Sequence, residues 1–157
     1  EDAGYQLLRD RWAEAIPGLI IAGVDDLTAR QQVGQSNRAI DQALANRPAG
    51  ATILLSHSPL ESTRAAAAGA DLMLSGHTHG GQVVIPGLGA VAARRFPVVA
   101  GLAHDQGGST VYVSRGVGTV YLPVRANCPP EVGVLTLRHQ NLGSRSPAMP
   151  QGTRRLA

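Results

Sequence analysis

The sequence predicts an α/β fold, a mixed β-sheet with flanking helices, on three observations. Short apolar runs typical of strands, such as residues 19–24 and 52–55, are separated by segments of helical composition. The connection over residues 58–70 is long enough for a helical crossover between parallel strands and too long for a tight hairpin. Residues 110–114 and 132–137 alternate as strands do, and 132–137 could pair antiparallel with Tyr112, so both strand orientations share one sheet.

Two helices and a strand are expected before residue 50. Residues 3–16 should form a one-sided helix that stops at Pro17-Gly18, because four apolar side chains recur near the helical period: Leu7, Leu8, Trp12 and Ile16. Residues 19–24 suit a buried strand. A second, shorter helix over residues 36–46 should close before the Pro48 turn.

Three aspartates lie at the ends of expected strands. Asp25 and Asp26 follow the strand of residues 19–24, where a carboxylate could contact a metal or a substrate. Adjacent aspartates after a strand more often cap a turn or a following helix, and we favour that structural role. Asp71 precedes its strand, at the wrong end for a ligand, and is expected to be a turn residue.

Residues 51–82 carry the functional signal. They predict a strand that ends at His57, a helical crossover, and a second strand followed by His77 and His79. Reactive groups in open α/β sheets collect beyond the carboxyl ends of the strands, and adjacent strands lie about 4.8 Å apart. We therefore expect the three imidazoles to meet at one edge. Neutral imidazole is a common ligand of Zn, Fe, Ni and Cu, so the pattern predicts a metal site.

Glycines surround the second and third histidines. Gly76, Gly80 and Gly81 would let the backbone approach a metal-bound anion and adopt positive φ without strain, which makes Gly80 and Gly81 candidate substrate-binding residues. The alternative is that His57 and His77 are helix-capping or core histidines. One histidine would favour that alternative; three at matching strand ends favour the metal site.

Arg115 follows the strand of residues 110–114, and its function has two interpretations. A guanidinium clamps phosphate oxygens with two hydrogen bonds, which would make Arg115 a substrate-binding residue. It could equally form a structural ion pair with Glu131, and both interpretations stay open. Arg125 is a similar but weaker candidate.

The remaining segments are expected to be loops. The sequence Pro86–Gly89 forces a turn, and residues 90–108 should be irregular, with His104 at the surface or at a substrate rim. Residues 139–157 are polar, basic and rich in Gly, Pro and Ser, which predicts a disordered tail.

Composition narrows the class of protein. At 157 residues, with 43% hydrophobic content, the chain fits one globular domain. The net charge of +3 comes from scattered arginines with few aromatic residues among them, so no nucleic-acid partner is predicted. Cys128 is the single cysteine, which excludes an internal disulfide and a C-x-x-C metal site. No apolar run reaches the ~18 residues of a membrane span, and no segment has the pattern of a signal peptide.

Two segments make the pattern specific. LLSHSP, from Leu54, and LSGHTHGGQ, from Leu74, resemble the last two sequence blocks of the calcineurin-like metallophosphoesterases, in the bacterial branch of YkuE and YaeI phosphodiesterases. Residues 112–138 resemble the closing segment of that branch, and residues 19–26 resemble a strand and turn upstream of the two blocks. The resemblance covers residues 1–138.

The resemblance implies a metallophosphoesterase α/β sandwich, of which residues 1–138 would form the C-terminal half. It implies two divalent ions (Mn, Fe, Zn or similar), with His57 and His77 on one and His79 on the other. The implied activity is hydrolysis of a phosphodiester or phosphomonoester substrate.

The family's first three blocks, DxH, GDxxD and GNH(E/D), which supply the bridging aspartate and further ligands, do not occur in the chain. Glu1 stands at about the place where the family chain has just left its third block. We therefore expect the chain to be inactive alone; a membrane anchor, which relatives often carry, would lie in the missing part. The alternatives are a catalytically incomplete metal-binding or assembly unit and, less favoured, a mononuclear His₃ zinc hydrolase.

Overall fold

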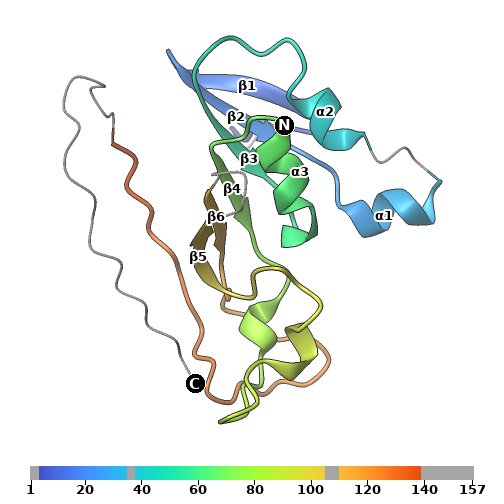
Figure 1. Cartoon of the computed structure of the whole chain (residues 1–157), viewed down its shortest axis with the longest axis vertical. Helices are drawn as coiled ribbons and strands as arrows, with labels where there is room; N and C mark the ends of the chain where they lie inside the picture. The colour runs from blue at the N-terminus through green and yellow to red at the C-terminus, as the bar shows by residue number, and fades with distance from the viewer. Residues whose placement is uncertain (1–3, 35–37, 105–109, 139–157) are drawn as a thin grey trace.

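Six strands form one mixed sheet in the computed structural model, which describes residues 4–34, 38–104 and 110–138. The strands lie in the order β1-β2-β3-β4-β6-β5 (Figure 1). Their bounds are β1 (Arg11–Ile16), β2 (Leu19–Gly23), β3 (Ala51–Leu55), β4 (Leu72–Ser75), β5 (Gly101–His104) and β6 (Thr110–Val113). The four inner strands are mutually parallel, and the two outer strands run antiparallel to their neighbours. The predicted fold class, a mixed sheet with flanking helices, is confirmed.

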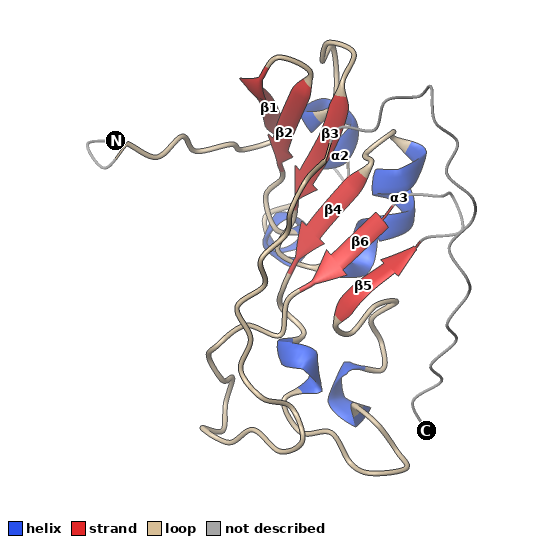
Figure 2. Cartoon of the chain, turned by 90° about the vertical axis from the view of Figure 1, so that its left-hand side faces the viewer, coloured by secondary structure: helices blue, strands red, loops and turns tan. Residues whose placement is uncertain are grey.

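Helices cover one face of this sheet (Figure 2). They are α1 (Leu27–Gln32), α2 (Ala39–Ala43) and α3 (Ser62–Ala67), with the short 3₁₀ turn η1 (Pro59–Glu61) before α3. Two further 3₁₀ turns, η2 (His79–Gly81) and η3 (Val91–Ala93), lie in the loops beyond the sheet. The main core lies between α2, α3 and the sheet, and it consists of Ala22, Ile40, Ala43, Leu44, Leu54, Ala65, Ala70, Met73, Val111 and Val113. Burial of these apolar surfaces holds the helices to the sheet.

The strand–crossover–strand unit forms as predicted. β3 and β4 are parallel neighbours, with Ile53 opposite Leu72 and Leu55 opposite Leu74. The crossover consists of η1 and α3, and the Ser58 hydroxyl caps the first of these turns. Asp71 accepts a hydrogen bond at 2.8 Å from the backbone N–H of Thr52, which confirms its structural role at the start of β4.

The prediction of a helix over residues 3–16 is wrong. Residues 11–16 form β1, and residues 4–10 are not helical. Pro17-Gly18 joins β1 to β2 as a two-residue hairpin loop in which Gly18 has a φ of 80°. Of the four apolar side chains, Trp12 of β1 packs against the core, and its Nε1 donates to the carbonyl of Ala45 at 2.9 Å.

The prediction of an antiparallel strand over residues 132–137 is also wrong. The described segment from Glu131 to Arg138 has no strand, although it runs along the sheet on the side away from the helices (Figures 1 and 2). The antiparallel neighbour of Tyr112 is instead Leu102 of β5, which corrects the expectation of loops throughout residues 90–108. The edge position beside β6 is occupied by β5, which is nearer to β6 in the sequence than residues 132–137 are.

The helical segments match the sequence only in part. The helix expected over residues 36–46 is present as the shorter α2, and residues 35–37 lie outside the described residues. Helix α1 was not predicted; its cap is Asp26, whose side chain accepts from the N–H of Ala29 at 3.0 Å. The tail expected over residues 139–157 lies outside the described residues.

Apolar side chains also line the sheet face away from the helices. Leu55 of β3, Leu74 of β4, Tyr112 of β6 and Leu102 of β5 are consecutive partners across four strands. Because side chains alternate between faces along a strand, these residues lie opposite the core residues Leu54 and Met73. Leu55 is 40% exposed, whereas Leu54 is completely buried.

We expect truncation of two neighbouring leucines to separate the two faces. Leu54→Ala should lower the free energy of unfolding by about 2–5 kcal/mol, because it opens a cavity in the core. Leu55→Ala, the matched control, should cost less than half as much, since its side chain is already partly in water. Urea unfolding of both variants measures the difference; equal losses would contradict the assignment of faces.

Candidate metal centre

The carboxyl ends of β3 and β4 bring His57 and His77 together. Beyond the last strand pair, the N–H of Gly76 donates to the carbonyl of His57 at 3.1 Å, so the two chain segments stay attached as they leave the sheet. His57 Nε2 lies 2.8 Å from His77 Nδ1, and the ring centroids are 4.6 Å apart. The predicted convergence of the strand ends is therefore observed for this pair.

His79 lies near the pair without joining it. Its Nδ1 is 3.2 Å from the carbonyl of Gly118, and it lines the same cavity as His57 and His77. Across residues 4–34, 38–104 and 110–138, no three His, Cys, Asp or Glu side chains are close enough to hold an ion together. The structure thus brings two of the three predicted ligands into contact and places the third at the rim.

Burial and the neighbouring ring favour the neutral form of His77. Burial lowers the pKa of His77, and the neighbouring His57 lowers it further, while the carboxylate of Asp26 acts in the opposite direction. A metal ion requires the unprotonated ring nitrogen. Two imidazole nitrogens bound to one ion at about 2.0–2.1 Å in a tetrahedral arrangement would lie ~3.4 Å apart. The observed contact of 2.8 Å is shorter than this separation and has the length of a hydrogen bond between the two rings, so the nitrogens would have to move apart to bind one ion.

The turn that carries His77 and His79 has strained backbone. His77 has a φ of 69° and His79 a φ of 51°, and Gln82 follows with 57°. Residues other than glycine rarely adopt the left-handed region, and such residues cluster at functional sites. Thr78, between the two histidines, is buried and fixed: its hydroxyl donates to the carbonyl of Val99 at 2.6 Å and accepts from the N–H of Gly80.

Gly80 and Gly81 are required by close packing in the same turn. Both have left-handed φ, 63° and 80°. A Cβ on Gly80 would lie 2.7 Å from the sulfur of Cys128, and one on Gly81 would lie 2.4 Å from the Cβ of Ala90. These contacts account for the glycines structurally, and their predicted role in substrate binding stays a prediction.

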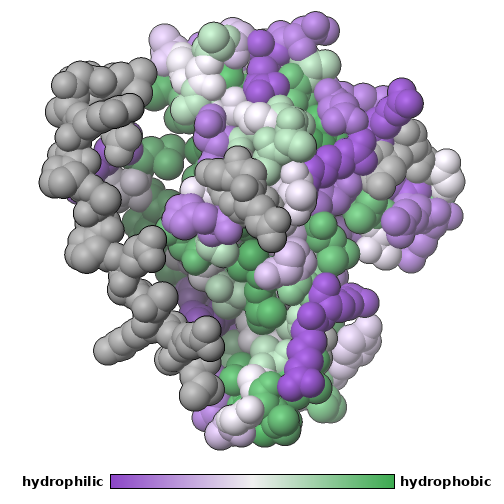
Figure 3. All heavy atoms as spheres, in the orientation of Figure 1, coloured by the Kyte–Doolittle hydropathy of each residue, from purple (hydrophilic) through white to green (hydrophobic). Residues whose placement is uncertain are grey.

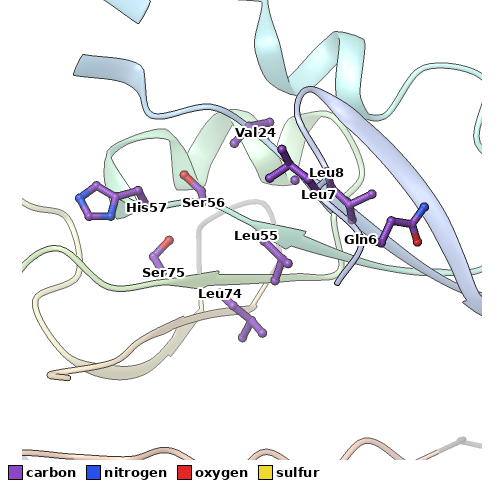
Figure 4. Close-up of a pocket in the computed structure, with 10 residues that line it drawn as sticks. Gln6, Leu7, Leu8, Val24, Leu55, Ser56, His57, Leu74 and Ser75 are labelled. Carbon is purple, nitrogen blue, oxygen red and sulfur yellow. The ribbon is translucent and has the colours of Figure 1, made fainter. Parts of the chain in front are cut away.

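Ser75 adds a polar group beside the histidine pair. Its hydroxyl is buried, and no hydrogen-bond partner for it occurs among the described residues. Figure 4 shows Ser56, His57 and Ser75 together at one end of a cavity of about 510 Å³ on the sheet face, with Leu7 and Leu8 at the other. Buried hydroxyls normally have partners, so Ser75 is an exception among the described side chains.

The two arginines have structural partners. The Arg115 guanidinium forms an ion pair with Glu131, which also accepts a hydrogen bond from the Tyr112 hydroxyl at 2.6 Å. Of the two interpretations of Arg115, the structure shows the ion pair. Arg125 donates to backbone carbonyls of the loops around it, those of His79, Arg115, Gly116, Gly118 and Cys128. Its guanidinium holds together the loops that surround the histidines.

The structure also shows the surroundings of Asp25, Asp26 and His104. Asp26 caps α1, as predicted, whereas Asp25 forms an ion pair with Arg9 at 2.6 Å and caps no helix among the described residues. His104 is exposed on β5, where its Nδ1 lies 3.2 Å from the Thr110 hydroxyl.

Sequence reasoning missed Gln82. Its amide binds the backbone of Val120 in both directions, accepting from the N–H at 2.7 Å and donating to the carbonyl at 3.1 Å, and it donates to the carbonyl of Leu122 at 2.9 Å. Its place directly after the glycine pair was the available signal. A glutamine alone does not indicate which distant loop it will hold.

Curated relatives place this geometry in a class of protein. The chain is 34% identical over 137 residues to a metallophosphoesterase of Aquifex aeolicus, a match that covers 87% of this chain and 52% of the relative. No protein-family model matches the chain, and no solved structure matches it. With its mixed sheet and its histidines beyond β3 and β4, the chain belongs to the metallophosphoesterase superfamily.

Two named relatives are similar over shorter stretches. The metallophosphoesterase YkuE of Bacillus subtilis is 40% identical over 91 residues, 57% of this chain and 32% of YkuE. The phosphodiesterase YaeI of Escherichia coli is 48% identical over 71 residues, 43% of this chain and 25% of YaeI. The chain spans about half the length, or less, of these curated relatives. In its described part, no helix has the length and apolar character to cross a membrane.

We expect the glycine turn to be intolerant of side chains. Gly81→Ala should lower the free energy of unfolding by about 1–3 kcal/mol, because the residue has left-handed φ and meets Ala90. Gly76→Ala is the matched control: its Cβ would meet nothing within 4 Å, and the change should stay within about 0.5 kcal/mol. Thermal or urea unfolding distinguishes them, and a neutral Gly81→Ala would contradict the packing described.

The Glu131 cluster predicts a pH dependence. The hydrogen bond from Tyr112 lowers the pKa of Glu131, with further lowering by Arg115. A carboxyl with a lowered pKa in the folded state contributes stability above its unfolded pKa of about 4.3, and this is lost as pH falls through the lowered value.

Glu131→Gln should therefore flatten the decline of unfolding free energy with acid below about pH 4.3. Urea unfolding of both proteins across pH 2–6 measures the slopes. Parallel slopes would show that the carboxyl titrates identically in the folded and unfolded chain.

Proposed function

We propose that the chain is part of a metal-dependent hydrolase of phosphoesters, acting on phosphodiester or phosphomonoester bonds through a binuclear metal centre. One observation carries the proposal: the contact between His57 and His77 at the carboxyl ends of adjacent parallel strands. The relatives named metallophosphoesterase and phosphodiesterase support the same class of reaction.

The residues present fit one wall of such a centre. His57 and His77 would hold one ion, since burial favours the neutral ring of His77. His79 would contribute to the second ion, with Nδ1 directed to the carbonyl of Gly118 and Nε2 left as the ligand atom. The unpartnered hydroxyl of Ser75 would accept or donate a hydrogen bond beside the first ion.

Divalent ions, when bound, supply acidified water as nucleophile and positive charge for the developing charge on the phosphoryl oxygens. The chain's own contribution is to position its imidazoles before any ligand arrives. The strained turn at His77 and His79 is held by Thr78 and by the buried glycines, which would keep both imidazoles at this edge of the sheet when an ion binds.

A second candidate is a metal-binding or assembly unit without catalysis. It is favoured by the absence of DxH, GDxxD and GNH(E/D) from the sequence, and by the lack of a three-ligand cluster in the described residues. The lack of a three-ligand cluster in the described residues also weighs against a self-sufficient His₃ zinc hydrolase. The chain's incomplete span of its relatives leaves further ligands to sequence beyond its own.

Metal binding tests the shared premise of the first two candidates. His57→Ala, His77→Ala and His79→Ala should each weaken Mn²⁺ or Zn²⁺ binding more than tenfold, the scale of losing a ligand. His104→Ala on β5, the control, should change nothing. Isothermal titration calorimetry measures this, and unchanged affinity in all three variants would contradict the metal site.

Activity separates the candidates. Hydrolysis of bis-p-nitrophenyl phosphate with Mn²⁺ should be absent for the chain alone and appear when a segment carrying the DxH, GDxxD and GNH(E/D) blocks is added. No turnover in either condition would support the second candidate, a metal-binding or assembly unit without catalysis. Turnover by the chain alone with zinc, abolished in His79→Ala, would favour the mononuclear site.

A further inference from the structure

A second cavity extends from the histidines into an apolar wall. This loop cavity has a volume of about 520 Å³, within the range of small-molecule sites. Its polar end is formed by His57, His77, His79 and Arg95, and its apolar wall by Val83, Phe96, Val120, Tyr121 and Leu122. Phe96 joins the two ends, because its ring packs edge-on against His77 at 5.3 Å between centroids.

The apolar wall is built largely from one exposed loop. Val120, Tyr121 and Leu122 expose large apolar side chains, and Val117 and Val124 flank them. Tyr121 is 101% exposed and therefore touches almost nothing in the folded chain. In Figure 3 apolar atoms gather at the lower end of the molecule, over the loops that follow β4. A patch of this kind beside a polar cavity is typical of a ligand-binding surface.

The backbone of the loop that carries Val120, Tyr121 and Leu122 is held by hydrogen bonds, although these side chains are exposed. Gln82 binds the backbone on both sides of Tyr121, through Val120 and Leu122. The carbonyl of Gly118 lies 3.2 Å from His79 Nδ1 and accepts from Arg125. The apolar wall is therefore tied to the same turn that positions the histidines, and its distance from them is set by hydrogen bonds between side chains and the loop backbone.

Tyr121 has a strained backbone conformation. Its φ is 61°, a region in which a bulky residue is an outlier. No contact in the described chain compensates for this strain, since the side chain is fully exposed. Strain of this kind persists where a function requires it.

The wall suits an apolar group better than a nucleobase. Recognition of a base needs free hydrogen-bonding groups at its edge. Among the described side chains of the wall, the Gln82 amide is already occupied by Val120 and Leu122, and the Thr78 hydroxyl by Val99 and Gly80. Beyond these two groups, the histidines and Arg95, the side chains that line the cavity are aliphatic and aromatic, apart from the hydroxyl of Tyr121.

We propose that the loop cavity is a subsite for an apolar substituent of the phosphoester, an acyl chain or an aromatic ring, with the phosphate held at the histidine end. This inference rests on the proposed function for the position of the phosphate. Arg95 supplies positive charge at that end, and Tyr121 and Leu122 supply the apolar contact.

Non-hydrolysable phosphonates test the subsite on the full chain with Mn²⁺. By calorimetry, octylphosphonate and phenylphosphonate should bind more than tenfold more tightly than methylphosphonate, since each buried methylene contributes roughly fourfold. The two ligands distinguish an acyl from an aryl preference. Equal affinity for all three phosphonates would overturn the subsite, as would tighter binding of AMP than of phenylphosphonate.

Variants locate the effect in the loop. Tyr121→Ser and Leu122→Ser should reduce the octyl-to-methyl affinity ratio at least fivefold. Tyr5→Ser, a matched control at an 87% exposed tyrosine that does not line the cavity, should leave the ratio unchanged. Tyr121→Gly should lower the ratio while raising the unfolding midpoint, because glycine relieves the left-handed strain. A lower midpoint in Tyr121→Gly, with an unchanged ratio, would assign the loop a purely structural role.

Failure of the subsite and of the proposed function give different results. If Mn²⁺ does not bind, the metal site fails, while the octyl-to-methyl ratio measured without metal still tests the apolar wall. If Mn²⁺ and methylphosphonate bind but the octyl group adds nothing, the subsite alone fails.

Discussion

The parallel pairing of β3 with β4 is the constraint on which the site depends. Register places Leu55 opposite Leu74, and the Gly76–His57 backbone hydrogen bond continues the attachment past the last strand residues. The backbone pairing therefore brings two imidazoles, twenty residues apart in sequence, to within 2.8 Å of each other. The buried core behind β3 and β4 supplies the stability that keeps this edge fixed.

Around this edge, the loops are organised by polar side chains more than by apolar packing. Gln82 and Arg125 act as clamps, each satisfying several backbone groups of segments that form no regular secondary structure. Such groups would otherwise need water or remain unpaired. The result is a rigid apolar rim on Tyr121 and Leu122, joined through Gly118 to the ring of His79.

Apolar side chains line the sheet face opposite the helices. Leu55 and Leu74 lie there in adjacent strands, and Leu102 lies in the edge strand β5, beyond Tyr112 of β6. Ser75 ends β4, and His57 follows β3. An apolar sheet face is normally packed against a second layer. The relatives are about two to four times the length of the matched part.

The sequence by itself determined the central unit, because hydrophobic runs, crossover length and strand-end histidines are local patterns that one fold satisfies. It also determined the superfamily, through the segments around His57 and His77. It could not decide the secondary structure of the N-terminal segment, because the apolar spacing there fits a helix or a strand. The pairing of β1 with β2 in a hairpin decides for the strand. Nor could the sequence choose between two functions of Arg115, which Glu131 resolved, or find the clamp at Gln82. Those outcomes depend on which distant backbone groups come within hydrogen-bonding range, and only the tertiary structure brings them there.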